Sequence, residues 1–225
     1  MEIKNTFNTL NVVTCAMLAA LAVVLSATFH HFAGANWQIA ILFSPMHFPV
    51  LLMGILCGPW LGLIGGTLTP VISFLMSGGP AYTTLVPMIF ELAMYGFLTG
   101  MLRSVFLKNP KINRFASIIA LVLAMIGGRL LNAIVGGIIE SASAGINFFV
   151  AFGKKLLGNF TSTWVGIIVQ LVLIPAILFA LQKSGILLKY LPDSPTNVWG
   201  KSEQADTSEP LVAATNETDS EQENK

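Results

Sequence analysis

From Ser44 to Arg103 the chain consists of three apolar segments joined by two very short connections. One connection is Gly58-Pro59-Trp60, and Ser77-Gly78-Gly79-Pro80 opens the other. Within this stretch glycines recur at four-residue intervals, at Gly54, Gly58, Gly62 and Gly66. Because lipid offers no hydrophobic drive for helix association, small residues that let backbones approach closely are typical of packed membrane helices. The stretch therefore predicts three helices that cross a membrane side by side.

The composition extends this interpretation to most of the chain. Apolar residues make up 54% and charged residues only 10% of the sequence, whereas soluble domains carry about 25% charged residues. The first apolar run is longer than the roughly 7–15 residues of a signal-peptide core, so we expect it to be a retained helix. The fold class that we predict is an all-α integral membrane protein, a bundle of six transmembrane helices. The expected spans are Leu10–Phe29, Pro45–Cys57, Trp60–Met76, Pro87–Arg103, Phe115–Ile139 and Thr161–Leu181.

The charges divide the chain into two parts and orient it. Residues 1–190 hold ten basic and three acidic residues, a balance of +7, whereas residues 191–225 hold eight acids and two lysines. We expect residues 1–190 to form one membrane domain and residues 191–225 to form an acidic, disordered cytoplasmic tail. In a six-span chain most basic residues of the connections share a side with both termini, so the positive-inside rule places both termini in the cytoplasm. Lys154 and Lys155 are the exception, because they fall on the outer side.

Polar residues inside the apolar segments are expected to gather in the outer half of the membrane. With Pro87 as the first residue of its helix, Glu91 would lie about 6 Å below the outer surface, at 1.5 Å per residue. With the fifth span leaving the membrane near Gly137, Arg129 would lie about 12 Å below it. Ionisable residues in membrane helices usually face a partner, a cavity or a substrate. Two interpretations stay open: a structural Glu91–Arg129 pair, or an outward-facing pocket in which Arg129 meets an acidic group of a ligand. The candidate binding residues are His47, Tyr82, Glu91, Tyr95, Arg129, Asn132 and Gln170.

Motifs of soluble enzymes and metal sites are absent from the sequence, which has no phosphate-binding loop, no G-x-S-x-G and no H-E-x-x-H. We therefore expect no enzymatic activity, no cofactor and no nucleic-acid partner. Cys15 and Cys57 lie in apolar segments, where packing is the expected role. Ala16 and Ala20 form a small-residue pair on the first span; from spacing alone it suits either helix docking or ordinary lipid contact.

Four sequence fragments together resemble the substrate-binding S component of energy-coupling factor (ECF) transporters. They are His47-Phe-Pro-Val-Leu-Leu-Met-Gly, Gly58-Pro-Trp-Leu-Gly-Leu, Thr69-Pro70 and Pro87-Met-Ile-Phe-Glu-Leu-Ala-Met-Tyr-Gly-Phe. The resemblance covers most of residues 10–190 and leaves the acidic tail outside.

The resemblance implies vitamin uptake across a cell membrane, expected to be a bacterial plasma membrane. An S component binds a micronutrient at its outer end and associates with a membrane T component and two ATPase subunits. Ala16 and Ala20 resemble the family's docking surface for the T component. For the substrate, Arg129 with Glu91, Asn132 and Tyr82 suits a ligand that carries a carboxylate and hydroxyl or amide groups. Pantothenate is our first prediction, and pyridoxine or a hydroxymethylpyrimidine is the next.

Other classes of membrane protein stay open at this point: a stand-alone secondary carrier or a structural membrane subunit. Secondary carriers often show inverted repeats with paired broken helices, and the sequence shows no such internal symmetry. Co-purification separates the classes, because an S component should bring a T component and ATPases with it whereas a carrier should transport alone.

Overall fold

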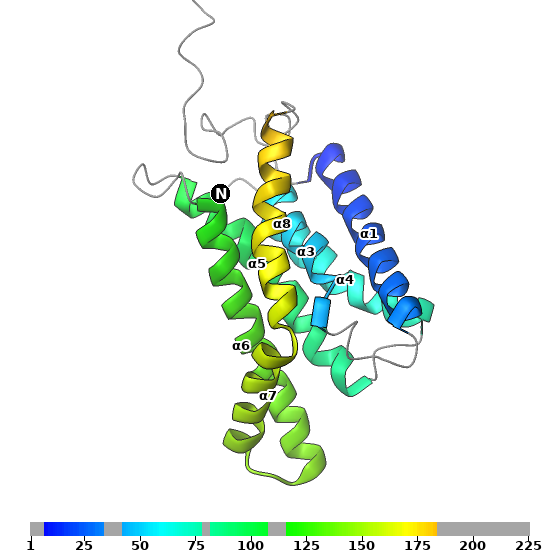
Figure 1. The fold of residues 1–225 in the computed structure, drawn as a ribbon, viewed down its shortest axis with the longest axis vertical. Coiled ribbons are helices and arrows are strands. Elements are labelled where there is room, and N and C mark those ends of the chain that lie inside the picture. The colour runs from blue at the N-terminus through cyan, green and yellow to red at the C-terminus, as the bar shows by residue number, and fades with distance from the viewer. Residues whose placement is uncertain (1–6, 34–41, 78–81, 108–115, 184–225) are drawn as a thin grey trace, which may run out of the picture.

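The computed structural model describes residues 7–33, 42–77, 82–107 and 116–183, and these are all-α, without a strand (Figure 1). The acidic tail and the boundary near residue 190 lie outside the described residues. The seven helices are α1 (Thr9–Ala33), α3 (His47–Cys57), α4 (Pro59–Ser77), α5 (Tyr82–Leu107), α6 (Ala116–Ala144), α7 (Phe148–Ser162) and α8 (Trp164–Lys183).

Five of these helices, α1, α4, α5, α6 and α8, are long and apolar enough to cross a membrane. The second predicted span corresponds to α3, which has only 11 residues. At 1.5 Å per residue it is about 17 Å long, well short of a hydrocarbon core of about 30 Å. Ten of its residues are nevertheless buried, because it lies among the other helices rather than against lipid (Figure 1). Five of the six predicted spans therefore correspond to candidate spans, and the second corresponds to a short, enclosed apolar helix, so a count of six spans stays a prediction.

Close backbone contacts hold α3, α4 and α5 together. A methyl group added at Gly62 would overlap the carbonyl oxygen of Gly96 in α5, and one added at Gly66 would overlap that of Leu92. A methyl at Gly54 would likewise overlap the Gly96 carbonyl. Gly58 has a different role: it ends α3 with φ of +89°, a conformation that favours glycine. The predicted close approach is confirmed at Gly54, Gly62 and Gly66, whereas Gly58 is explained by its place at the end of α3.

The predicted start of the fourth span was wrong. The helix α5 begins at Tyr82, and Pro87 lies inside it rather than at its first position. Proline lacks the N–H that would bond to the carbonyl four residues earlier, but here its ring fits against Gly136 of α6, with 3.5 Å between Pro87 Cγ and the Cβ position of that glycine. Glu91 is nine residues into α5, about 14 Å along its axis rather than 6 Å.

The segment between the fifth and sixth expected spans, from Glu140 to Phe160, is also largely helical. The helix α6 continues to Ala144, and α7 folds back along it after a turn at Gly145, where φ is +66°. Asn147 caps α7 by accepting a hydrogen bond from the backbone N–H of Phe149 at 2.9 Å. Figure 1 shows this α6–α7 hairpin extending beyond the other helices, with α8 continuing from α7 in the reverse direction to α6. Arg129 is therefore 15 residues, or about 22 Å, from the end of its helix.

Candidate functional site

A buried hydrogen-bond network centred on Glu91 joins α3, α5 and α6. The side chain of Glu91 is 6% exposed. Its Oε1 accepts a hydrogen bond of 2.7 Å from the Tyr95 hydroxyl, and its Oε2 accepts one of 2.7 Å from Asn132 Nδ2. His47 Nε2 lies 3.6 Å from Oε1, and the His47 ring packs against that of Tyr95. The carboxylate is thus contacted by three of the side chains that the sequence analysis named as candidate binding residues.

Asn159 extends this network to α7, and sequence reasoning missed it. Its Nδ2 donates to Asn132 Oδ1 at 2.9 Å and lies 3.4 Å from the backbone carbonyl of Arg129. Its only sequence signal is Asn159-Phe160-Thr161, a glycosylation pattern that occurs easily by chance. A helix prediction for residues 148–162 would have been needed to place this amide opposite α6.

Arg129 is 2% exposed, and it is held by α7 and by the residue that follows α7. Its Nη1 donates to the Asn159 carbonyl and to Thr163 Oγ1, both at 2.6 Å, and its guanidinium lies 5.7 Å from the centre of the Phe160 ring. Its Nε and Nη2 are buried without a hydrogen-bond partner.

The described residues do not contain the direct Glu91–Arg129 pair that was one of the two interpretations. No ion pair within 4.0 Å joins them there, and the recorded basic partner of Glu91 is His47. Arg129 also borders a slot of about 70 Å³ between α6, α7 and α8. The other residues that line this slot are all apolar: Val122, Met125, Ile126, Phe160, Ile167 and Leu171. The guanidinium is therefore a buried cation whose described surroundings supply no carboxylate at salt-bridge distance.

Two other predicted site residues lie apart from the Glu91 network. Gln170 of α8 is 1% exposed; its Nε2 lies 3.4 Å from the Ser44 carbonyl, and its Oε1 is buried without a partner. Tyr82 is 72% exposed at the first position of α5. None of the hydrogen bonds described above involves it. Because α5 begins at Tyr82, this residue lies nine residues, or about 14 Å along the helix axis, before Glu91.

The predicted docking pair lies on the outward face of α1. Ala16 and Ala20 are both exposed, and the neighbouring side chains on this face include Met17 and Val24. Cys15, in contrast, faces inward, with its Sγ 3.4 Å from the Leu61 carbonyl of α4, and Cys57 is also buried. The expected packing positions of the two cysteines are confirmed.

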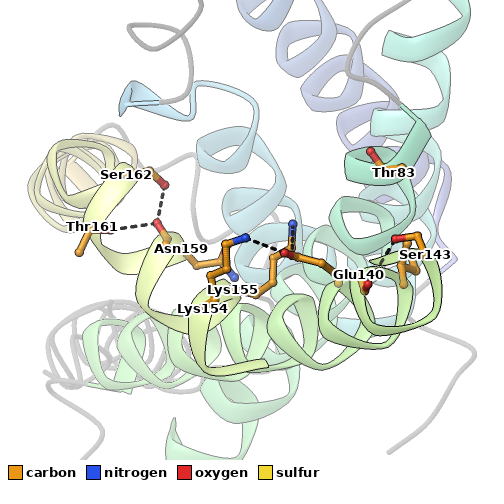
Figure 2. Close-up of a pocket in the computed structure, with 11 residues that line it drawn as sticks. Thr83, Glu140, Ser143, Lys154, Lys155, Asn159, Thr161 and Ser162 are labelled. Carbon is orange, nitrogen blue, oxygen red and sulfur yellow. Dashed lines mark hydrogen bonds and ion pairs between the residues drawn. The ribbon is translucent and has the colours of Figure 1, made fainter. Parts of the chain in front are cut away.

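A polar cleft of about 680 Å³ lies beside the network, between the start of α5, the end of α6 and α7 (Figure 2). Glu140 Oε1 binds Lys154 Nζ at 2.8 Å, and its Oε2 lies 3.3 Å from Lys155 Nζ. Asn159 lines the cleft and also belongs to the buried network, so it connects the two. The lining residues are Thr83, Gly136, Ile139, Glu140, Ser143, Lys154, Lys155, Gly158, Asn159, Thr161 and Ser162.

Comparison with known families gives the class of protein. Residues 10–189 match the family described as ECF transporter, substrate-specific component. The chain belongs to this family. No curated protein and no solved structure matches it. As a substrate-specific component it is a membrane-embedded transport subunit and not an enzyme, and its family works with a small-molecule substrate and with the T and ATPase subunits of ECF transporters. The apolar helices agree with a location in the membrane.

Proposed function

We propose that this substrate-specific component binds a small water-soluble vitamin or vitamin precursor from the outer side of a bacterial plasma membrane. Partner subunits then use ATP to move the vitamin inward. The charge distribution of the connections supports cytoplasmic termini. This orientation places the end of the bundle with the α6–α7 hairpin outside. The buried network and the cleft then belong to the half of the molecule that a solute reaches first.

The observation that carries the proposal is the unpaired edge of Arg129. Its Nε and Nη2 are buried and have no partner. These two donors form one edge of the planar guanidinium, and this edge binds both oxygens of a carboxylate side by side. A buried charge without a partner is strongly destabilising. A ligand carboxylate would remove that cost, and this gives Arg129 a role in binding rather than in joining helices.

Other buried atoms suit the remaining polar groups of such a ligand. Gln170 Oε1 is an unpaired acceptor for a hydroxyl or an amide N–H, and His47 Nδ1 is a second unpaired atom. Tyr95 and Asn132 both already donate hydrogen bonds to Glu91, so the proposed part of these three residues is to hold His47 and the surrounding helices in place. Pantothenate combines a carboxylate, an amide and hydroxyl groups, and it remains the first choice. Pyridoxine and a hydroxymethylpyrimidine are the alternatives; they lack a carboxylate and would leave the edge of Arg129 unpaired.

The exposed face of α1 is the proposed surface for the T component. Ala16 and Ala20 are one helical turn apart and leave room for another helix to approach closely. A stand-alone carrier or a structural subunit would not need this surface.

Thermal unfolding of the purified chain with a panel of water-soluble vitamins tests the proposal. A ligand at 100 times its dissociation constant adds about 2.7 kcal/mol to the free energy of unfolding. We expect pantothenate to raise the midpoint clearly. We expect panthenol, in which an alcohol replaces the carboxylate, to raise it less at the same concentration. Stabilisation by pyridoxine or a hydroxymethylpyrimidine instead would reject the proposal that the ligand carries a carboxylate. No response to any vitamin would reject the proposed ligand class.

A further inference from the structure

The cleft between α6 and α7 carries an excess of positive charge that the buried network does not explain. Two ammonium groups share a single carboxylate, because Lys154 and Lys155 each contact one oxygen of Glu140. Among the described residues no other charged side chain lines the cleft, so their charge balance is +1. The side chain of Lys154 is 71% exposed and that of Lys155 is 40% exposed. Each ammonium has three N–H donors, and within the described part of the chain each has one polar contact, with Glu140, so both have donors left for a solute anion.

These lysines are also the two basic residues that break the positive-inside pattern of the sequence. Basic residues on the outer side run against the trend that orients membrane proteins. Their position at a cleft suggests a role other than orientation.

The remaining walls of the cleft offer hydrogen-bond acceptors. Thr161 and Ser162 donate their hydroxyl protons to backbone carbonyls of α7, which leaves the lone pairs of the hydroxyl oxygens open to a ligand. Asn159 uses its Nδ2 within the buried network, and no described residue donates to its Oδ1. A complementary solute therefore has an anionic end and hydroxyl or amide donors along its length. No aromatic residue is among those that line the cleft, so it offers no ring on which a flat heterocycle would stack.

Asn159 places this cleft next to the proposed carboxylate site. Its side chain borders the cleft, while its backbone carbonyl accepts a hydrogen bond from Arg129 Nη1 at 2.6 Å. A solute that contacts Asn159 from the cleft is thus separated from the buried guanidinium of Arg129 by Asn159 alone.

We infer that the α6–α7 cleft is a capture site for an acyclic carboxylate that carries hydroxyl or amide groups. The ammonium groups of Lys154 and Lys155 attract its carboxylate before the solute moves on to Arg129. The inference rests on the proposed function, and it adds a second, outer site with a separate kinetic role. Charges at the rim of a binding site change mainly the association rate and its salt dependence, whereas buried charge pairs change mainly the dissociation rate.

Stopped-flow binding of pantothenate to the purified chain in neutral detergent tests this role. The variant Lys154→Gln/Lys155→Gln changes the charge balance of the cleft from +1 to −1, and Glu140→Gln changes it to +2. At an ionic strength of about 0.01 M, where the Debye length is about 30 Å, we expect the double variant to associate about fivefold more slowly. Glu140→Gln should associate faster than the wild type, and dissociation rates should change little.

Three controls separate steering from general damage. Lys108→Gln/Lys111→Gln removes two lysines from the segment between α5 and α6 and should leave association unchanged. At an ionic strength of about 1 M, where the Debye length is about 3 Å, the differences between the variants should disappear. Panthenol has no carboxylate, and its association rate should not respond to the charge of the cleft.

Equal association rates for wild type, double variant and Glu140→Gln at low salt would overturn the inference while leaving pantothenate binding intact. Absence of any pantothenate binding to the wild type would instead overturn the proposed substrate and the inference with it. Anionic lipid headgroups carry the same chemistry, so the comparison is repeated in nanodiscs of zwitterionic lipid with and without anionic lipid. A difference between wild type and double variant that appears only with anionic lipid would assign the lysines to the membrane and contradict solute capture.

Discussion

Asn132 donates a hydrogen bond of 2.7 Å to Glu91 Oε2 and so joins α6 to α5 inside the membrane-spanning part of the protein. The same amide accepts a hydrogen bond from Asn159 of α7 at 2.9 Å. One side chain therefore holds three helices in register around a buried carboxylate. This arrangement gives the network a structural role that is independent of any ligand, and it can be tested separately.

Replacement of Asn132 by aspartate should destabilise the protein. The change keeps the shape of the side chain but removes the N–H donor and places a second carboxyl group against Glu91. Leaving a buried acceptor without its donor costs about 1–3 kcal/mol. The measurement is thermal unfolding at neutral pH.

The matched control is Asn147→Asp, the same chemical change at the N-cap of α7. That side chain only accepts a hydrogen bond, and aspartate caps helices as well as asparagine does. An unfolding midpoint for Asn132→Asp equal to that of Asn147→Asp would show that the network does not hold the helices together.

Gly96→Ala should weaken the packing of α5 against α4. The added methyl would overlap the carbonyl oxygen of Gly62, which is backbone and cannot move aside as a flexible side chain would. Overpacking of this kind typically costs about 1–3 kcal/mol, measured as a lower unfolding midpoint. Gly153→Ala is the control, because nothing lies within 4 Å of the added methyl there; it should be stabilising by about 0.5–1 kcal/mol, since alanine favours a helix over glycine. Equal unfolding midpoints for Gly96→Ala and Gly153→Ala would argue against a close backbone contact at Gly96.

Bulky substitutions on the outward face of α1 should separate assembly from ligand binding. Ala16→Leu/Ala20→Leu should keep ligand affinity unchanged but reduce co-purification with the T component and the ATPases, because leucine prevents a close helix approach. Ala176→Leu/Ala180→Leu makes the same change at exposed positions four residues apart on α8 and should assemble normally. If both pairs assemble as the wild type does, α1 is not the docking surface.

The proposed orientation predicts which positions a membrane-impermeant maleimide reaches in intact cells. Ser143→Cys, exposed near the end of α6, should be labelled from outside, whereas Lys108→Cys, in the segment between α5 and α6, should be labelled only after permeabilisation. The native cysteines supply a low background, because Cys15 and Cys57 are both buried. The reverse labelling pattern would place the termini outside and reject an outward-facing site.

Sequence reasoning succeeded where a strong local signal coincided with the tertiary contact. Glycines at four-residue spacing mark the α3–α4–α5 interface, and the spacing of Glu91 and Tyr95 places both on one face of α5, where they form a hydrogen bond. Long apolar runs correctly predicted five of the helices, although the predicted start of α5, at Pro87, was five residues too late. Proline is often the first residue of a helix, but here Pro87 lies inside α5, close to Gly136 of α6.

The part of the site that came from α7 could not be predicted from the sequence. Lys154, Lys155 and three polar residues at its end interrupt the apolar pattern, so the sequence analysis placed most of α7 in a connection between two spans. Without that helix, neither the contact between Asn159 and Asn132 nor the cleft with Glu140 follows from spacing. The partners of Arg129 were missed for the same reason, because its hydrogen bonds go to Asn159 and Thr163 rather than to Glu91.

The affinity of the Arg129 variants for pantothenate tests the central claim most directly. Titration calorimetry on wild type, Arg129→Ala and Arg129→Lys compares loss of the charge with loss of the two-donor edge alone. We predict at least about tenfold weaker binding for Arg129→Ala, equivalent to about 1.4 kcal/mol, and a loss for Arg129→Lys as well, because lysine cannot bind a carboxylate through two parallel N–H groups. Unchanged pantothenate affinity in folded Arg129→Ala would contradict the account, because the unpaired edge of Arg129 would then have no part in binding.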